Sequence, residues 1–296
     1  MTCSRTDAFC DWLDVTCSPD SSFVDRLIIF LDVGGYPLAY ADDRSQSFRV
    51  GDGILRLDTE RKWHRASASG SVLSHFRVVG LFEQYLSLLS DVPHTVTRLD
   101  AAVDTSDDFP RVLTGLRERF PAGTVSFSRK SLKVTELLSV RSDGLQTGTW
   151  YAGHRTTAKV TARAYDKQDE ILSRTGVESP PRTRYELTFR KATGATLKDA
   201  SMPSSLFYEH AERLGLSVPP GTPAWKSHDL GGWQSVPVDT DFTMERFARR
   251  VESSPELKHL ASLASQFGPN GTAMVMRCFE KALRDCSQDS DNAKSA

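Results

Sequence analysis

The chain has 296 residues, of which 39% are hydrophobic and 25% are charged, and its formal net charge is −1. This composition is typical of a globular protein with a substantial core, and a nearly neutral chain is not one that simply coats nucleic acid. No apolar run approaches the roughly 20 residues of a membrane helix, and residues 1–14 lack the basic and apolar segments of a secretory signal. We therefore expect a cytoplasmic protein without a membrane partner.

Charge is unevenly distributed along this chain. Residues 129–167 contain eight Lys or Arg against three Asp or Glu, and residues 182–198 contain five against one. Basic clusters in a neutral chain favour a defined phosphate-binding face over general adhesion to polyanions. The five cysteines form no C-x-x-C pair, so neither a zinc site nor a disulfide framework is expected.

The expected elements begin with strands over 22–60, where Gly34-Gly35 and Gly51-Asp52-Gly53 give two hairpin signals. Hydrophobic periodicity and helix-start signals predict the later elements. These are a helix over 78–90, a strand over 97–104, a helix from Asp107 to about Arg119, strands over 124–190 with a short helix after Asp166, and helices over 203–215, 241–265 and 272–285. Together they predict an α+β fold, an antiparallel β-sheet with helices packed on one face, plus a helical C-terminal portion.

The chain is expected to divide into four regions. Residues 1–70 are mainly β, and it is open whether they belong to the same domain as the next region or form a pseudo-repeat of its sheet. A central region covers 71–217, and a helical C-terminal region covers 218–285. The polar tail, 286–296, is expected to be disordered.

Three of the expected strands carry polar side chains on one face and apolar side chains on the other, because side chains alternate along a strand. The polar positions are Lys159, Thr161, Arg163, Tyr165 and Lys167, then Arg182, Arg184, Glu186, Thr188 and Arg190, and also Arg98, Asp100 and Asp104. Such a face is typical of a solvated sheet with surface ion pairs. It would also suit a site that cleaves phosphodiester bonds, and the residues alone leave both interpretations open.

Four short motifs occur in order: R-L-D-A-A-V-D at 98–104, T-W-Y-A-G at 149–153, R-A-Y-D-K at 163–167 and R-Y-E at 184–186. This series resembles the replication initiation factors of rolling-circle plasmids and filamentous phages, the Rep_trans type, over about residues 70–215. The resemblance implies an enzyme that nicks one strand of origin DNA, with 71–217 as the catalytic region. Attack by a tyrosine would give a 5′-phosphotyrosine link and a free 3′-OH for the polymerase.

The resemblance implies that Tyr165 is the nucleophile, and Tyr151 in the adjacent motif is the main rival. A phenol has a pKa of about 10, so it needs activation at neutral pH. Lys167 and Arg163 lie two residues away on the same face, where they could stabilise the phenolate or the phosphate oxygens, and they complete the expected catalytic set. Tyr185 should instead face the core.

The expected metal ligands are Asp100, Glu186 and Asp104. No two of the seven histidines form a His-hydrophobe-His pair, so carboxylates would hold the ion, which suits Mg²⁺ or Mn²⁺. Four residues along a strand span about 13 Å, so the two aspartates cannot easily share one ion without a bulge. One of them could instead orient Arg184 or a water molecule. No other cofactor is expected.

The expected DNA-binding residues are Arg184, Arg190, Lys159, Arg129 and Lys130. Arg184 and Arg190 could instead only form ion pairs within the protein. Arg129 and Lys130 could instead lie in a solvated loop. Trp150 is expected to pack in the core rather than to stack on a base.

The expected partner is origin DNA, both single- and double-stranded, and a host helicase and a second copy of the chain are further candidates. Two other functions stay open. One is a DNA-binding regulator on the same scaffold that does not cleave, which would need only the cations. The other is a relaxase of a mobile element, which shares the chemistry.

Overall fold

A computed structural model of the chain describes residues 7–19, 22–120, 133–141, 144, 146–154 and 158–225. Within these residues, ten strands form one antiparallel sheet in the order β2-β3-β4-β5-β1-β6-β10-β9-β8-β7. Helices accompany this sheet, so the expected α+β class is confirmed. None of the described helices is long and apolar enough to cross a membrane.

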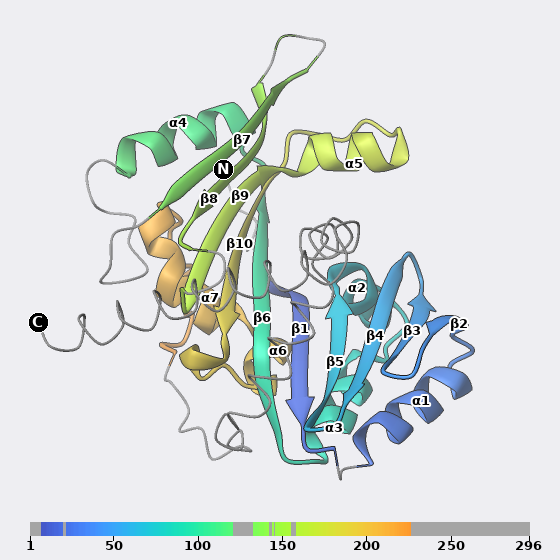
Figure 1. Cartoon of the computed structure of the whole chain (residues 1–296). Helices are drawn as coiled ribbons and strands as arrows, with labels where there is room; N and C mark the ends of the chain where they lie inside the picture. The colour runs from blue at the N-terminus through green and yellow to red at the C-terminus, as the bar shows by residue number, and fades with distance from the viewer. Residues whose placement is uncertain are drawn as a thin grey trace, which may run out of the picture. The chain divides into compact units, whose positions relative to one another are not determined.

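The elements follow one another along the chain as Figure 1 labels them. The strands are β1 (Phe9–Cys17), β2 (Leu38–Ala41), β3 (Ser45–Val50), β4 (Gly53–Glu60), β5 (Trp63–Ser69), β6 (His94–Thr105), β7 (Val134–Val140), β8 (Gln146–Ala152), β9 (Val160–Asp166) and β10 (Thr183–Arg190). The α-helices are α1 (Phe23–Val33), α2 (Gly70–Val78), α3 (Phe82–Ser90), α4 (Phe109–Arg119), α5 (Lys167–Thr175), α6 (Leu197–Ser201) and α7 (Ser204–Ala211). The expected helices over 241–265 and 272–285 lie outside the described residues.

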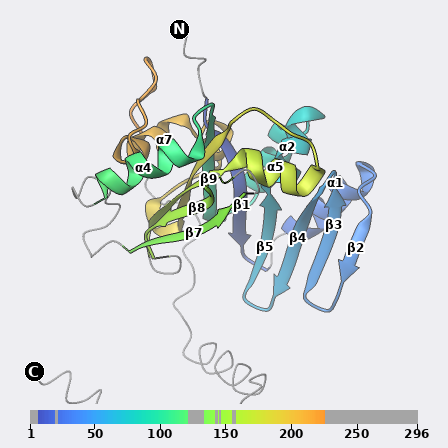
Figure 2. The ribbon, with the colours of Figure 1, turned by 90° about the horizontal axis from the view of Figure 1, so that it is seen from above.

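The core lies against one face of the sheet. Helices α1, α2, α3, α4, α6 and α7 all contribute buried apolar side chains to it, and Figure 2 shows α4 and α7 together beside β7 and β8. Helix α5 buries no residue. In β9 the even-numbered side chains from 160 to 166 are buried and the odd-numbered ones are partly exposed. The predicted alternation and the packing of helices on one face are therefore confirmed. Within the described residues no apolar core covers the opposite face of the sheet, which is called the open face below.

The N-terminal quarter differs from the expectation of strands alone. The segment 23–33 is helix α1, whose buried side chains are Phe23, Val24, Leu27 and Leu31. Their helical spacing outweighs the β-leaning composition of the segment, because it lets one stripe pack against the core. Gly34 ends this helix instead of turning a hairpin, whereas the turn at 51–52 does join β3 to β4. Strand β1 and helix α2 were not predicted.

The predicted helix over 78–90 corresponds to α3, which starts four residues later than predicted. Helix α2 ends at Val78 and α3 starts at Phe82. Gly80 lies between them with φ of +75°, a left-handed conformation that glycine adopts without strain and that breaks the helix.

The sheet consists of two halves with the same topology. In each half a first strand leads through a helix into a meander of four strands, and the last strand of the meander pairs with the first strand. The N-terminal half comprises β1 to β5 and the C-terminal half comprises β6 to β10. Strands β1 and β6 join the halves at the centre, with Leu13 opposite Leu99, as Figure 1 shows. Residues 9–69 thus form a topological repeat of the second half within a single sheet.

Candidate functional site

The open face of the C-terminal half gathers most of the residues that the motifs single out. Strands β9 and β10 place Arg163 opposite Glu186 and Tyr165 opposite Arg184. Strands β10 and β6 place Arg184 opposite Asp104. Directly opposite residues on one face have Cβ atoms about 5 Å apart, so these side chains are neighbours although up to 82 residues separate them in the chain.

Asp11 joins this group through a β-bulge in β1. The register between β1 and β6 shifts between Cys10 and Trp12, so that Asp11 is an extra residue. Cys10 and Leu13 are fully buried on the core side, while Asp11 and Trp12 are both partly exposed on the open face. The sequence analysis missed Asp11. The signal was present, since the apolar positions 10, 13, 15 and 17 contain one step of three residues among steps of two.

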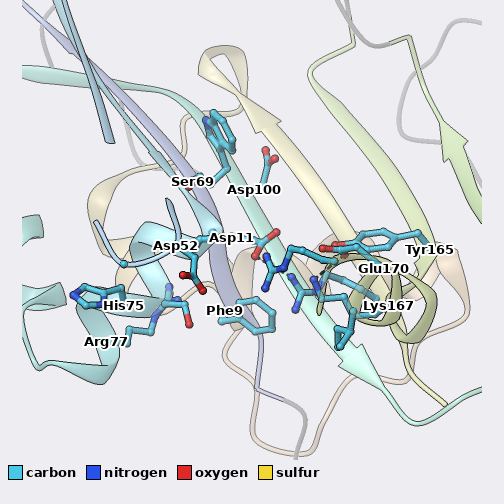
Figure 3. Close-up of a pocket in the computed structure, with 18 of the residues that line it drawn as sticks. Phe9, Asp11, Asp52, Ser69, His75, Arg77, Asp100, Tyr165, Lys167 and Glu170 are labelled. Atoms are coloured by element: carbon cyan, nitrogen blue, oxygen red, sulfur yellow. Dashed lines mark hydrogen bonds and ion pairs between the residues drawn. The ribbon is translucent and has the colours of Figure 1, made fainter. Parts of the chain in front are cut away.

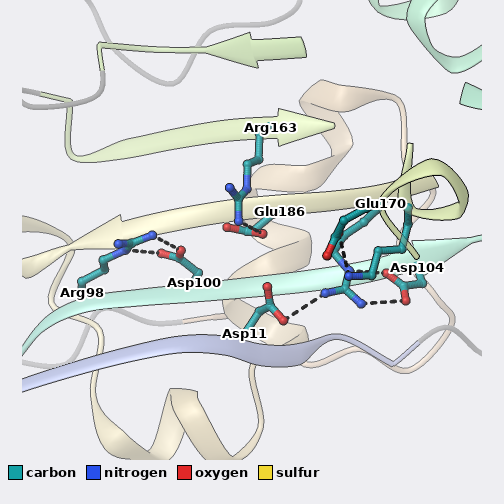
Figure 4. Close-up of polar contacts among 9 residues, drawn as sticks. Asp11, Arg98, Asp100, Asp104, Arg163, Glu170 and Glu186 are labelled. Atoms are coloured by element: carbon teal, nitrogen blue, oxygen red, sulfur yellow. Dashed lines mark hydrogen bonds and ion pairs between the residues drawn. The ribbon is translucent and has the colours of Figure 1, made fainter. Parts of the chain in front are cut away.

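Arg184 bridges two strands at the edge of this group. Its Nε and Nη2 atoms donate to the two carboxylate oxygens of Asp104 at 2.5 and 2.9 Å, and its Nη1 atom donates to Asp11 at 3.0 Å. Both oxygens of Asp104 are thus bound by a guanidinium group (Figure 4). The sequence analysis left open that Asp100 or Asp104 orients Arg184, and in the structure Asp104 makes these contacts.

Two further carboxylates are bound by arginines. Arg98 donates to both oxygens of Asp100, with its Nε atom at 2.9 Å. Arg163 donates from its Nη2 atom to Glu186 Oε2. Both carboxylates are almost completely buried, with 1% of each side chain exposed. Figure 4 shows them on neighbouring strands with Asp11, each beside its arginine.

The surroundings of Glu186 disfavour the charged form of its carboxylate. Burial, followed by the nearby charges of Asp100 and Asp11, raises its pKa to about 8, and Arg163 partly opposes this rise. Its Oε1 atom is buried and has no hydrogen-bond partner within the described part of the chain. A buried acceptor of this kind is costly unless something binds it. Glu186 Oε1 is therefore an acceptor that other groups of the described residues do not satisfy.

Tyr165 lies beside Arg163 and opposite Arg184. Its ring has Arg163 Cζ at 5.3 Å and Lys167 Nζ at 5.8 Å from its centroid. Burial raises the pKa of its hydroxyl well above the ordinary value, while the charge of Arg184 lowers it. Lys167 also pairs with Glu170 at 2.7 Å.

The turn that follows Tyr165 is defined by a helix cap. Asp166 accepts a hydrogen bond from the backbone N–H of Asp169 at 3.0 Å, which satisfies one free donor at the start of α5. Tyr165 is thus the last residue but one of β9, and helix α5 begins at Lys167.

A cleft of about 910 Å³ contains part of this group, whereas Glu186 lines a separate cavity of about 100 Å³. Asp11, Asp100, Tyr165 and Lys167 line the cleft together with residues of α5 and of α2, including His75. Figure 3 shows Tyr165 and Lys167 on one side, the two aspartates between, and His75 on the other side. Both halves of the sheet therefore contribute to one cleft.

The other tyrosines are placed differently. Tyr151 lies opposite Arg163 on β8 and lines the separate cavity of about 100 Å³. Tyr185 is buried in the core, as predicted. Trp150 is fully buried there, which confirms core packing.

The remaining predicted DNA-binding residues spread along the same face. Arg190 lines the small cavity beside Tyr151, and Lys159 is exposed at the start of β9. The pair at 129–130 lies outside the described residues. Cations thus lie on both sides of the buried carboxylates.

The carboxylates of this face can be compared with the ligands that a divalent cation requires. In the described residues, no three His, Cys, Asp or Glu side chains converge closely enough to hold a metal, because arginines bind the carboxylates of Asp11, Asp100 and Glu186. The donors themselves are the hard oxygen ligands that Mg²⁺ and Mn²⁺ prefer. The donor atoms are therefore of the chemical type that such an ion binds, while their described positions do not converge on one point.

Comparisons with known proteins include a distant structural likeness. No family model matches the chain, and no curated protein matches its sequence. A solved structure of the rolling circle replication initiator protein from Geobacillus stearothermophilus aligns with 70% of this chain and 84% of its own, at 18% identity and a TM-score of 0.49. A likeness this distant transfers neither residues nor activity, so the function has to be argued from the residues of this chain.

Proposed function

We propose that this chain is a DNA-nicking initiator of rolling-circle replication with Tyr165 as its nucleophile. One observation carries the proposal: Tyr165 shares a single cleft with Asp11, Asp100 and the cations Lys167 and Arg184. A nucleophile, carboxylates and guanidinium groups together are what phosphodiester transesterification needs. DNA binding alone would require only the cations.

The reaction exchanges one phosphate ester for another. Tyr165 Oη attacks phosphorus, the bond from phosphorus to the 3′ oxygen breaks, and a 5′-phosphotyrosine forms. The proton that the phenol loses is balanced by the proton that the 3′-hydroxyl gains. Because burial disfavours the phenolate, it must be stabilised where it forms. Arg184 and Lys167 do so with charge held beside the ring.

The buried carboxylates form the other part of the proposed site. Asp11, Asp100 and Glu186 would hold Mg²⁺ or Mn²⁺, which when bound supplies charge that stabilises the leaving 3′ oxygen. Asp104 is assigned a different role, because Arg184 occupies both of its oxygens. It orients that arginine toward the cleft.

The test is formation of the covalent adduct. A pool of single-stranded oligonucleotides that tile the DNA encoding the chain and its flanks is incubated with protein and Mn²⁺, then run on a denaturing gel. Wild type should give a shifted band and Tyr165→Phe should give none, since it lacks only the attacking oxygen. Tyr151→Phe is the matched control and should still form the adduct. Urea unfolding should be nearly unchanged in both variants.

Two outcomes would contradict the proposal at different levels. If Tyr165→Phe still forms an adduct and peptide mapping finds Tyr151 modified, the nucleophile is wrong while the nicking activity stands. If wild type binds the oligonucleotides but forms no adduct with any of them, the chain is a non-cleaving DNA-binding regulator.

A further inference from the structure

Trp12 occupies a position in the open face that the proposed chemistry does not use. It lies directly opposite Asp100 in the register of β1 and β6, so the two Cβ atoms are about 5 Å apart. The bulge places Asp11 immediately beside it on the same face. Trp12 also lines the cleft that contains Tyr165. An aromatic ring therefore lies next to the proposed metal ligands.

Two contacts hold this ring in place. Its Nε1 atom donates to Asp14 Oδ1 at 2.7 Å. The guanidinium carbon of Arg98 lies 4.6 Å from the ring centroid, and Arg98 is itself bound to Asp100. The only polar atom of the indole is thus satisfied within the protein, and the ring is coupled through one arginine to a buried carboxylate.

Packing does not explain why a tryptophan is needed here. Among the described residues, the apolar side chains that form the core or pack against it do not include Trp12. Trp150, by contrast, is completely buried. A rigid aromatic surface that lines a polar cleft and has no free hydrogen-bonding group is suited to stack on another flat ring.

We propose that Trp12 is a stacking platform for one nucleobase of the single strand, next to the phosphate that is cut. This inference rests on the proposed function and adds a positioning residue to it. Base stacking on an aromatic side chain tolerates any base and strengthens binding of a single strand by about 5- to 150-fold. Because Arg98 connects the ring to Asp100, the stacked base and the reacting phosphate are held in one geometry.

The test places a fluorescent base at successive positions of the bound strand, because only a stacking role would quench the base at one of them. The probe is the oligonucleotide that forms the adduct, with 2-aminopurine at successive positions around the nick, and the protein carries Tyr165→Phe so that it binds without cutting. One position should be quenched, and Trp12→Ala should remove that quenching and weaken binding roughly tenfold or more. Trp12→Phe should retain most of both. If no oligonucleotide forms the adduct, the scan is made in an oligo-dT strand.

Trp63 is the matched control. It is also partly exposed and has an arginine, Arg65, at 5.5 Å from its ring centroid, but it does not line the cleft. Trp63→Ala should leave quenching and affinity unchanged. If quenching survives Trp12→Ala, or if Trp63→Ala loses as much quenching as Trp12→Ala, Trp12 is not a stacking platform. In that case, adduct formation by wild type would still support the nicking activity. If Trp12 stacks on a base but wild type forms no adduct, the stacking proposal stands and the nicking proposal fails.

Discussion

The two halves of the sheet share one topology, but one matched ion pair has its charges reversed between them. Taking Leu13 opposite Leu99 as the centre, the position of Glu186 in the C-terminal half corresponds to Arg65 in the N-terminal half. The partner of each residue on the next strand is likewise exchanged, Arg163 in one half and Asp58 in the other. Both halves thus keep a cross-strand ion pair, with its ends reversed.

Under the proposed function, the reversal restricts the site to the C-terminal half. Asp14 is the counterpart of Asp100, but its Oδ1 atom accepts hydrogen bonds from Trp12 and Ser67. A guanidinium group stands where the C-terminal half has Glu186. An ion pair of either polarity joins adjacent strands, whereas a cation site needs several carboxylates at one place. The fold therefore depends on the presence of the cross-strand ion pair, whereas the proposed site depends on which strand carries its carboxylate.

The largest expected effect concerns which half contacts DNA. About six phosphate contacts predict a slope of log K against log salt near −5 on duplex DNA, an approximately thousandfold loss between 50 and 200 mM salt. Lys159→Gln should reduce the slope by about one, because it lies on the basic C-terminal half. Arg56→Gln, an exposed cation of the N-terminal half, should leave it unchanged. Filter binding at several salt concentrations measures this, and a flat salt response would remove the DNA-binding face altogether.

Glu186→Gln should be the most damaging change to cleavage that keeps the side chain's shape. It removes the charge of a proposed ligand, so nicking of the adduct-forming oligonucleotide in Mn²⁺ should fall by at least about a hundredfold. Chelator should abolish nicking by wild type. Undiminished cutting in chelator would show that the carboxylates do not act through a metal.

Asp58→Asn makes the matched change in the N-terminal half. Asp58 is buried and accepts hydrogen bonds from Arg65 at 3.0 and 2.5 Å. Its loss should lower the free energy of unfolding by about 1 kcal/mol, because the arginine is partly exposed and can be solvated. Nicking should change by less than about twofold at a temperature where the variant is folded. A hundredfold loss of nicking would mean that both halves are catalytic.

The smallest expected effect is a pH dependence confined to the C-terminal half. Burial lowers the pKa of His210 from its ordinary value near 6.5, and its ring packs on Phe189 of β10 at 5.3 Å. The neutral form is favoured on folding, so the stabilisation is present above pH 6.5 and is lost as the pH falls through the lowered pKa, by less than about 1 kcal/mol. Hydrogen exchange should increase in β10 more than in β4, and His210→Gln should abolish the difference.

The polar face of the sheet was predictable because it depends on local periodicity. Alternation in β6, β9 and β10 placed Asp100, Tyr165 and Glu186 on one polar face, and the structure has them there. Helix α4 was predictable from its acidic start and Pro110 in the first turn. These features need only the direction of each side chain from its own backbone.

Asp11, Trp12 and α1 were not predictable in the same way. The role of Asp11 depends on one extra residue in a strand that pairs with β6, some 90 residues further along the chain. Helix α1 has β-leaning residues whose state was decided by the core on which they pack. Local preference is weaker than tertiary packing in both places.

The sequence by itself determined which side chains can share a face and which chemistry they can perform, because residue type and strand period are local properties. Only the tertiary structure decided that two halves meet at β1 and β6, that Asp104 is taken by Arg184, and that Asp11 and Trp12 enter the cleft. Those outcomes depend on pairing between distant strands, and a shift of register by one residue turns every side chain of a strand to the other face.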